Sequence, residues 1–338
     1  MSSVVLITGA AGFLGGLLSS AIHHDSLRPG VKLILADVVE PKAPAGSTAT
    51  VLKADLTDTA QVESLFATSY GIPDVVYCLH GIMSRGSEDN FDLGVKINVD
   101  SVRMLLEAAR KFRRPQVPPI KFVFTSSLAV YGGPLPDIIT PFTAASPQGS
   151  YGFAKLTSEL IINEYTRRGW VDGRILRLPT IVVRSGAPAG ATSSFISGII
   201  REPLQGQKAI CPIGNSIDSP ELSLRLWLAS PQTTIRNLVI ASHIKADKFM
   251  THTRVVCLPG FTATVRDELD ALLAIGGPDA LERVVFEDDP VNRRIVSSWP
   301  SAFDNSYALS LGFLVDEGGM LPIVKQFQTD LALDSNVL

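Results

Sequence analysis

Charged residues and long hydrophobic runs are both scarce in this chain. Asp, Glu, Lys and Arg make up only 19% of the 338 residues, and the formal net charge is −3. The longest basic cluster covers residues 110–114, which is typical of a solvated helix end. No stretch reaches the roughly 18 uninterrupted apolar residues that a membrane-spanning helix needs. We therefore expect neither nucleic acid nor a membrane as a partner.

Cysteine is equally scarce, and its spacing predicts neither a disulfide framework nor a metal site. Cys78, Cys211 and Cys257 all fall within apolar, strand-like runs. Buried thiols in a reducing compartment explain such positions best. Met1 is followed almost directly by a strand-like run, which leaves no room for a cleavable leader. These features predict a cytoplasmic protein without a metal site.

The first half of the chain alternates short apolar runs with longer amphipathic ones. This alternation is typical of parallel strands joined by crossover helices, and buried parallel strands read as near-continuous apolar runs. The sequence therefore predicts an α/β fold with a doubly wound parallel sheet. The predicted strands are Val4–Thr8, Lys32–Asp37, Asp74–Leu79, Ile120–Ser126 and Arg174–Leu178, and the predicted helices are Phe13–His23, Thr59–Ala67, Phe91–Lys111 and Tyr151–Arg168.

The regular alternation ends near Pro179, where segments rich in Gly, Ser and Pro begin. We expect residues 1–178 to form the sheet domain and residues 179–338 to form a smaller, intertwined C-terminal lobe that binds substrate over the strand ends. In that lobe the sequence predicts helices at Ser194–Pro203, Ser230–His243, Val265–Leu273 and Met320–Leu333, with short strands at Arg254–Leu258 and Arg283–Glu287.

A glycine-rich turn joins the first predicted strand to the first predicted helix. Glycines at positions 9, 12 and 15 allow a tight turn, close approach of the backbone to a pyrophosphate and close helix–strand packing. The helix that opens with Phe13 and Leu14 would present free N–H groups to the same phosphates. This strand–turn–helix context is the one that a Rossmann dinucleotide site requires, although such a turn can also be purely structural.

Asp37 ends the second predicted strand, about 20 residues beyond the last glycine of the turn. A carboxylate there accepts hydrogen bonds from the ribose hydroxyls and repels a 2′-phosphate, which predicts NAD rather than NADP. The alternative is an exposed aspartate that merely closes a strand. Asp55 and Leu56 follow another short strand and are predicted to lie near the adenine, although a helix N-cap by a nearby Asp or Thr is an equal alternative.

Tyr151 and Lys155 lie four residues apart on a predicted helix and therefore share one of its faces. A nearby ammonium favours the phenolate and lowers the pKa of a tyrosine, which suits a general base. The strand end Thr125-Ser126-Ser127 precedes this helix. It would bring its hydroxyls to the carboxyl ends of the sheet strands, where the cofactor binds. The three features together predict proton transfer beside a nicotinamide.

The glycine turn, Asp37, the Ser-Ser-Leu-Ala-Val-Tyr-Gly strand end and the Tyr-Gly-Phe-Ala-Lys helix resemble the extended short-chain dehydrogenase/reductase superfamily over the whole chain. The resemblance implies that Ser127, Tyr151 and Lys155 are catalytic. It also implies that Leu79, Gly81, Asn98 and Pro179 line the cofactor, together with Tyr151 and Lys155. His80 departs from the family pattern and inherits no role, so a packing histidine is favoured over a catalytic one.

A segment of the lobe, residues 191–204, is similar to the matching segment of D-erythronate dehydrogenases, which oxidise the hydroxyl beside the carboxylate of a four-carbon sugar acid. That similarity implies oxidation of a C2 hydroxyl to a 2-keto acid. A carboxylate substrate needs a clamp, for which we expect Arg184 first and Arg201 second. Each could instead have a structural role, by bonding a carbonyl or by capping a helix. Hydroxyl contacts are expected from Ser84, Ser127, Thr180, Ser193 and Ser194.

In the mechanism that these residues suggest, Tyr151 takes the substrate proton, Ser127 orients the reacting oxygen and Lys155 holds the ribose. Two alternatives stay open: a nucleotide-sugar epimerase or dehydratase with tightly bound NAD, and a non-enzymatic NAD-sensing regulator. Relatives commonly dimerise through the two long helices, so a homodimer is expected. Its candidate apolar contacts are Leu156, Leu160, Ile161 and Tyr165.

Overall fold

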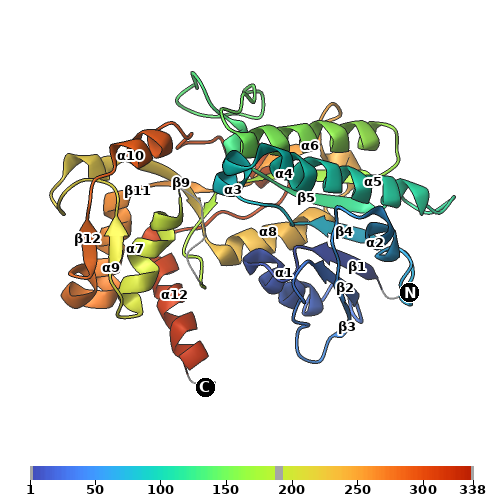
Figure 1. Cartoon of the computed structure of the whole chain (residues 1–338), viewed down its shortest axis with the longest axis horizontal. Helices are drawn as coiled ribbons and strands as arrows, with labels where there is room; N and C mark the ends of the chain where they lie inside the picture. The colour runs from blue at the N-terminus through green and yellow to red at the C-terminus, as the bar shows by residue number, and fades with distance from the viewer. Residues whose placement is uncertain (1–2, 187–192, 336–338) are drawn as a thin grey trace.

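The computed structural model describes residues 3–186 and 193–335, and its centre is a seven-stranded sheet (Figure 1). The strand order is β10-β6-β5-β4-β1-β2-β3, and every neighbouring pair is parallel. The predicted α/β fold with a doubly wound parallel sheet is thereby confirmed. The strands are β1 Val4–Thr8, β2 Lys32–Asp37, β3 Thr48–Lys53, β4 Val75–Cys78, β5 Lys121–Ser127, β6 Asp172–Leu178 and β10 Val255–Cys257.

Helices cover both faces of this sheet, which explains why its central strands are apolar throughout. One core cluster joins the sheet to α1 and α8, and another joins its opposite face to α2, α5 and α6 (Figure 1). The helices are α1 Phe13–His23, α2 Thr59–Ser64, α3 Ser84–Asp89, α4 Phe91–Val95, α5 Ser101–Lys111, α6 Ser150–Arg167 and α8 Pro231–His243.

Two local features differ from the sequence-based expectations. The strand predicted for the lobe at Arg254–Leu258 instead joins the main sheet as β10, where Val255 pairs with Ile175 of β6. A short apolar run carries no information about its partner strand, so its pattern could not assign it to a sheet. The helix predicted at Phe91–Lys111 is divided into α4 and α5 by one π-helical turn, Lys96–Asp100. A π-helical turn of this kind often marks a functional site.

The lobe has its own core cluster, which lies beside the carboxyl ends of the sheet strands (Figure 1). Its small sheets have the orders β11-β9-β7 and β12-β8. Among the described residues no helix could span a membrane, and no cluster of potential ligands could hold a metal ion. The remaining elements are β7 Thr180–Ile181, α7 Ser194–Leu204, β8 Ala209–Cys211, β9 Arg225–Ala229, β11 Phe261–Thr264, α9 Val265–Leu281, β12 Val284–Phe286, α10 Pro290–Ser297, α11 Ser306–Ser310 and α12 Met320–Ser335.

Candidate active site

The glycine turn lies between β1 and α1, and its glycines are required by close approaches of the backbone. Gly9 has φ +72°, and a Cβ there would lie 2.7 Å from the backbone nitrogen of His80. A Cβ on Gly15 would lie 2.1 Å from the carbonyl oxygen of Gly9. No side chain fits at either position, so the turn is tight and the backbone at the start of α1 stays open to a ligand. This arrangement fits a pyrophosphate at the helix N-terminus.

Asp37, at the end of β2, reaches across to this turn. Its carboxylate accepts hydrogen bonds from the backbone N–H groups of Ala11, at 3.1 Å, and Val39, at 3.3 Å. The contact with Ala11 fixes the carboxylate beside the glycine turn, as the sequence predicts for a ribose-binding aspartate. A negative charge at this position fits a ribose diol and repels a 2′-phosphate.

Asp55 and Leu56 follow β3 in two different environments. Asp55 is exposed and accepts hydrogen bonds from the N–H and hydroxyl of Thr57, which lower the pKa of its carboxyl. A shallow pocket beside it is lined by Val38, Lys53, Ala54, Asp55 and Gln61. The side chain of Leu56 is buried in the core, which leaves only its backbone for contact with a cofactor. The N-cap of α2 is the neighbouring Asp58.

The loop after β4 is held by Asn98, which lies in the π-helical turn. The Asn98 side-chain oxygen accepts a hydrogen bond from the N–H of Ile82 at 3.0 Å, and its amide donates to the carbonyl of Ile82 at 3.0 Å. A Cβ on Gly81 would lie 2.7 Å from the same side-chain oxygen. Leu79 bonds through its N–H to the carbonyl of Thr8. Asn98 thus sets the position of a loop that borders the glycine turn.

His80, whose role the sequence leaves open, is a partly buried and fully bonded histidine. Its Nε2 lies 2.6 Å from the Ser101 hydroxyl, which itself donates to the carbonyl of Ile97. Nε2 therefore carries the proton, and Nδ1 accepts from the Thr8 hydroxyl at 2.9 Å. Burial, with a contribution from Lys155, lowers the pKa of His80 to about 3. The neutral ring joins β1 to α5 through these hydrogen bonds. This arrangement agrees with a packing histidine rather than a catalytic one.

Ser127, Tyr151 and Lys155 converge where β5 ends and α6 begins. A Cβ on Gly152 would lie 2.0 Å from the carbonyl oxygen of Ala129, so the first turn of α6 packs directly on the turn after Ser127. The Lys155 ammonium donates to the carbonyl of Thr125 at 2.9 Å and lies 5.5 Å from the centre of the Tyr151 ring. The structure thereby brings together the three residues predicted to be catalytic.

A buried ion pair beneath these residues was missed by the sequence analysis. The Arg177 guanidinium of β6 binds both carboxylate oxygens of Glu159, at 2.9 and 2.6 Å, and donates to the Tyr131 hydroxyl at 2.6 Å. Glu159 also accepts from the hydroxyl of Ser126, the neighbour of Ser127. The only available signal was that Glu159 follows Lys155 by four residues on α6. The network fixes α6 against β5 and β6.

The two arginines proposed for a substrate carboxylate have different environments. Arg201 is only 3% exposed, and its guanidinium donates to the Arg184 carbonyl at 2.9 Å and to Glu202 at 2.5 Å. Arg184 pairs with no carboxylate among the described residues. Burial, together with the nearby charge of Arg201, lowers the pKa of its guanidinium, whereas Tyr151 raises it. Of these two arginines, Arg184 is therefore the one without a carboxylate partner among the described residues.

The remaining predicted contacts are less closely tied to this centre. Ser84 opens α3, Pro179 is buried between β6 and β7, and Thr180 begins β7. Ser193 and Ser194 lie at the start of α7, whose Ser197 hydroxyl accepts from the N–H of Arg184 at 3.1 Å. Part of the segment that resembles D-erythronate dehydrogenases, residues 191–192, lies outside the described residues.

Comparison with known proteins agrees with this geometry. The profile of the NAD dependent epimerase/dehydratase family matches residues 5–219, which include the glycine turn, Asp37 and the Tyr151–Lys155 helix. The chain belongs to this family of NAD-dependent enzymes.

Relatives within the family cover nearly the whole chain. D-erythronate dehydrogenase of Cupriavidus necator is 40% identical, covering 97% of this chain and 99% of its own. D-erythronate dehydrogenase of Haemophilus influenzae is 39% identical, covering 96% and 98%. A solved structure, described as a nucleoside-diphosphate-sugar epimerase from Agrobacterium tumefaciens, has a TM-score of 0.85 at 35% identity, covering 96% of this chain and 92% of that one.

Proposed function

We propose that this enzyme oxidises the C2 hydroxyl of a small sugar acid of the D-erythronate type to a 2-keto acid, with NAD as the hydride acceptor. The observation that carries the proposal is the Arg184 guanidinium, which has no carboxylate partner among the described residues and interacts electrostatically with Tyr151, because an acid substrate needs a permanent cation beside the proton-accepting group. The similarity to D-erythronate dehydrogenases supports the same substrate class.

The residues around the glycine turn fit NAD. Gly9, Gly12 and Gly15, with the N–H groups at Phe13 and Leu14, would hold the pyrophosphate, and Asp37 would bind the ribose hydroxyls. When bound, NAD supplies an acceptor for the hydride that leaves C2 of the substrate. Asp37 disfavours NADP because its carboxylate would face the 2′-phosphate.

The chain's own residues handle the proton and the orientation of the substrate. Tyr151 acts as the phenolate and takes the proton of the C2 hydroxyl as the hydride leaves, which returns it to the neutral phenol. Before that transfer the Lys155 ammonium, fixed by the carbonyl of Thr125, stabilises the phenolate. Ser127 orients the reacting oxygen from the end of β5. Arg184 would bind the carboxylate through two parallel N–H groups, and Ser84, Thr180, Ser193 and Ser194 would contact the remaining hydroxyls.

NADH absorbance on mixing the protein and NAD with a panel of four- to six-carbon aldonic acids tests this function. Net NADH formation with D-erythronate, and weaker formation with longer acids, is the expected result. A nucleotide-sugar epimerase would instead retain NAD through purification and give no net NADH. That outcome with the whole panel would overturn the proposal.

We also propose that the protein is a homodimer that packs α5 and α6 against their copies. Leu160 on α6 is 64% exposed, and Phe153, about two turns earlier on the same helix, stacks on Phe91 of α4 at 6.1 Å between ring centres while both rings stay exposed. The other apolar residues that the sequence suggests for this interface are less exposed. Tyr165 is buried, and Leu156 and Ile161 are partly buried against the chain's own cores.

A further inference from the structure

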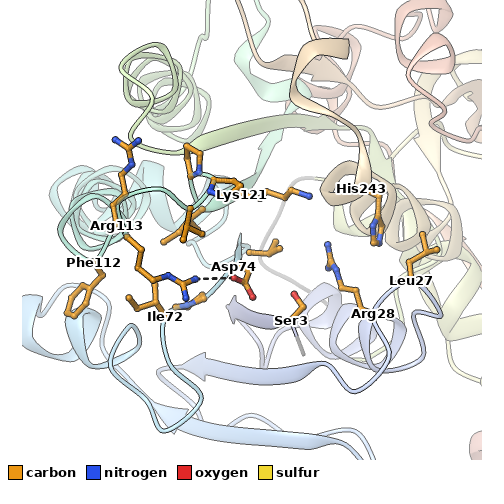
Figure 2. Close-up of a pocket in the computed structure, with 16 residues that line it drawn as sticks. Ser3, Leu27, Arg28, Ile72, Asp74, Phe112, Arg113, Lys121 and His243 are labelled. Atoms are coloured by element: carbon orange, nitrogen blue, oxygen red, sulfur yellow. Dashed lines mark hydrogen bonds and ion pairs between the residues drawn. The ribbon is translucent and has the colours of Figure 1, made fainter. Parts of the chain in front are cut away.

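A second cavity of about 340 Å³ lies at the amino ends of the sheet strands (Figure 2), whereas the candidate active site lies at their carboxyl ends. It is bordered by the amino ends of three strands, with Ser3 before β1, Asp74 before β4 and Lys121 at the start of β5. Ser127 is at the other end of β5, roughly 20 Å away along the strand. The cavity is therefore separate from both the cofactor and the substrate positions.

Two cations that point into this cavity have no carboxylate partner among the residues that the structure describes. Figure 2 shows Arg28, from the loop after α1, and Lys121 extending toward the same region beside His243. Arg28 is only 7% exposed; its Nη2 donates to the Ser242 hydroxyl at 2.7 Å, whereas its buried Nη1 has no partner. Lys121 donates one hydrogen bond, to the carbonyl of Ser242 at 2.8 Å.

The carboxylates nearby are already engaged by other groups. Asp74 accepts from the N–H of Val4 at 2.9 Å and from Arg114 at 3.2 Å. Asp25 accepts from the His243 ring at 2.7 Å. Burial lowers the pKa of the Lys121 ammonium, and the charges of Arg174 and Arg28 lower it further, whereas those of Asp172 and Asp74 raise it. Arg28 and the partly buried Lys121 thus bring two positive charges to one part of the cavity, which an anion would neutralise.

Much of the remaining cavity wall is apolar and would suit an uncharged body attached to that anion, although Ser3, Asp74, Arg113, Arg114 and His243 also border the cavity. Two cations with unused N–H groups match the two negative charges of a phosphate monoester better than the single charge of a carboxylate. The apolar wall consists of Leu27, Ile72, Val75, Phe112, Val117 and Ile120, with prolines at 73, 118 and 119.

We propose that this cavity is a binding site for a phosphate monoester with a compact apolar body. The phosphate lies between the Arg28 guanidinium and the Lys121 ammonium, and the apolar body extends from there along the apolar part of the cavity wall. Neither the NAD site nor the substrate site takes part, so the inference does not depend on the proposed function.

Calorimetric titration of phenyl phosphate into the protein saturated with NAD tests this site, because NAD blocks binding at the glycine turn. We expect saturable binding of one phenyl phosphate per chain, tighter than that of inorganic phosphate, which lacks the apolar body, and of benzyl alcohol, which lacks the charge. The absence of saturable phenyl phosphate binding would overturn the proposal. Binding of inorganic phosphate with equal affinity would equally overturn it.

Three charge-matched variants locate the site. Arg28→Gln and Lys121→Gln should each weaken phenyl phosphate binding at least tenfold, since each removes a charged donor. Arg167→Gln removes an equal charge from an exposed position at the end of α6 and should leave the affinity unchanged. If Arg28→Gln does not fold, the affinity of Lys121→Gln for phenyl phosphate still tests the site. Wild-type affinity in Lys121→Gln, or an equal loss in Arg167→Gln, would contradict the assignment.

Discussion

The Arg201 guanidinium donates a 2.9 Å hydrogen bond to the main-chain carbonyl of Arg184, so one arginine holds the backbone of the other. Arg201 is buried and also bonded to Glu202, whereas the Arg184 side chain has no carboxylate partner among the described residues. Arg201 therefore has a structural role, and the Arg184 side chain is the one available to a substrate. This division favours Arg184 as the carboxylate clamp.

Arg184→Ala should lower kcat/KM for an aldonic acid by about 10- to 150-fold, which corresponds to losing a charged hydrogen-bond partner worth about 1.5–3 kcal/mol. Arg184→Lys should recover little of the loss because an ammonium cannot form two parallel bonds. Steady-state kinetics with varied acid measures the effect, and NAD affinity measured separately should not change.

Arg201→Ala serves as the structural comparison. It should lower the free energy of unfolding by about 1–3 kcal/mol, because the Arg184 carbonyl and the Glu202 carboxylate lose a buried partner. Urea unfolding measures this change. Full acid oxidation in Arg184→Ala, combined with its loss in a folded Arg201→Ala protein, would place the carboxylate on α7 instead.

Tyr151→Phe should reduce turnover by about 10²- to 10⁴-fold while NAD affinity stays close to that of the wild type. Only the titrating hydroxyl is removed, and the ring can keep its place beside Lys155. Stopped-flow measurement of NADH formation gives the rate, and fluorescence titration gives the NAD affinity. Most of the activity surviving in this variant would eliminate Tyr151 as the base.

The residues that could be predicted from sequence are those whose local pattern carries the information. The spacing of residues along single elements is enough to predict the glycine turn, Asp37 and the Tyr151–Lys155 pair. In the structure all of them lie at the carboxyl ends of the sheet strands. By contrast, the Glu159–Arg177 pair joins α6 to β6, and nothing in either segment signals the other. The parallel pairing of β10 with β6 was hidden for the same reason.

Asp37→Ala and Asp37→Asn should both weaken NAD binding and reduce the difference between the affinities for NAD and NADP. Asn keeps an oxygen acceptor for the N–H of Ala11 but removes the charge. The Asn variant therefore tests the charge of Asp37 apart from its hydrogen bond to the glycine turn. We expect the Asp37→Asn variant to bind NADP more tightly than the wild-type protein does, as measured by titration with NADH and NADPH. Equal binding of the two cofactors by the wild-type protein would contradict the assignment of Asp37.

Leu160→Glu should dissociate the proposed homodimer, because a buried unpaired carboxylate at the interface is costly. Light scattering across a range of concentrations would show a monomer mass for this variant and a dimer mass for the wild type. Leu333→Glu, at an equally exposed position on α12, should remain dimeric. A wild-type mass that stays monomeric at every concentration would refute the dimer.

Glu268 on α9 is fully buried, and within residues 3–186 and 193–335 neither of its carboxyl oxygens has a hydrogen-bond partner. Burial raises its pKa well above the usual value, so the folded protein binds a proton that the unfolded chain releases near pH 4.5. The folded state is therefore favoured below the unfolded-state pKa and loses stability as pH rises toward the folded-state pKa.

Glu268→Gln should consequently raise the free energy of unfolding at pH 8, and the gain should shrink toward zero as the pH falls to about 4.5. A neutral amide releases no proton on unfolding, so it removes this pH dependence. Urea unfolding at several pH values measures the difference. Glu282→Gln, at an exposed position near the end of the same helix, should show no such trend. A gain in Glu268→Gln that is constant from pH 4.5 to 8 would mean that Glu268 titrates alike in both states.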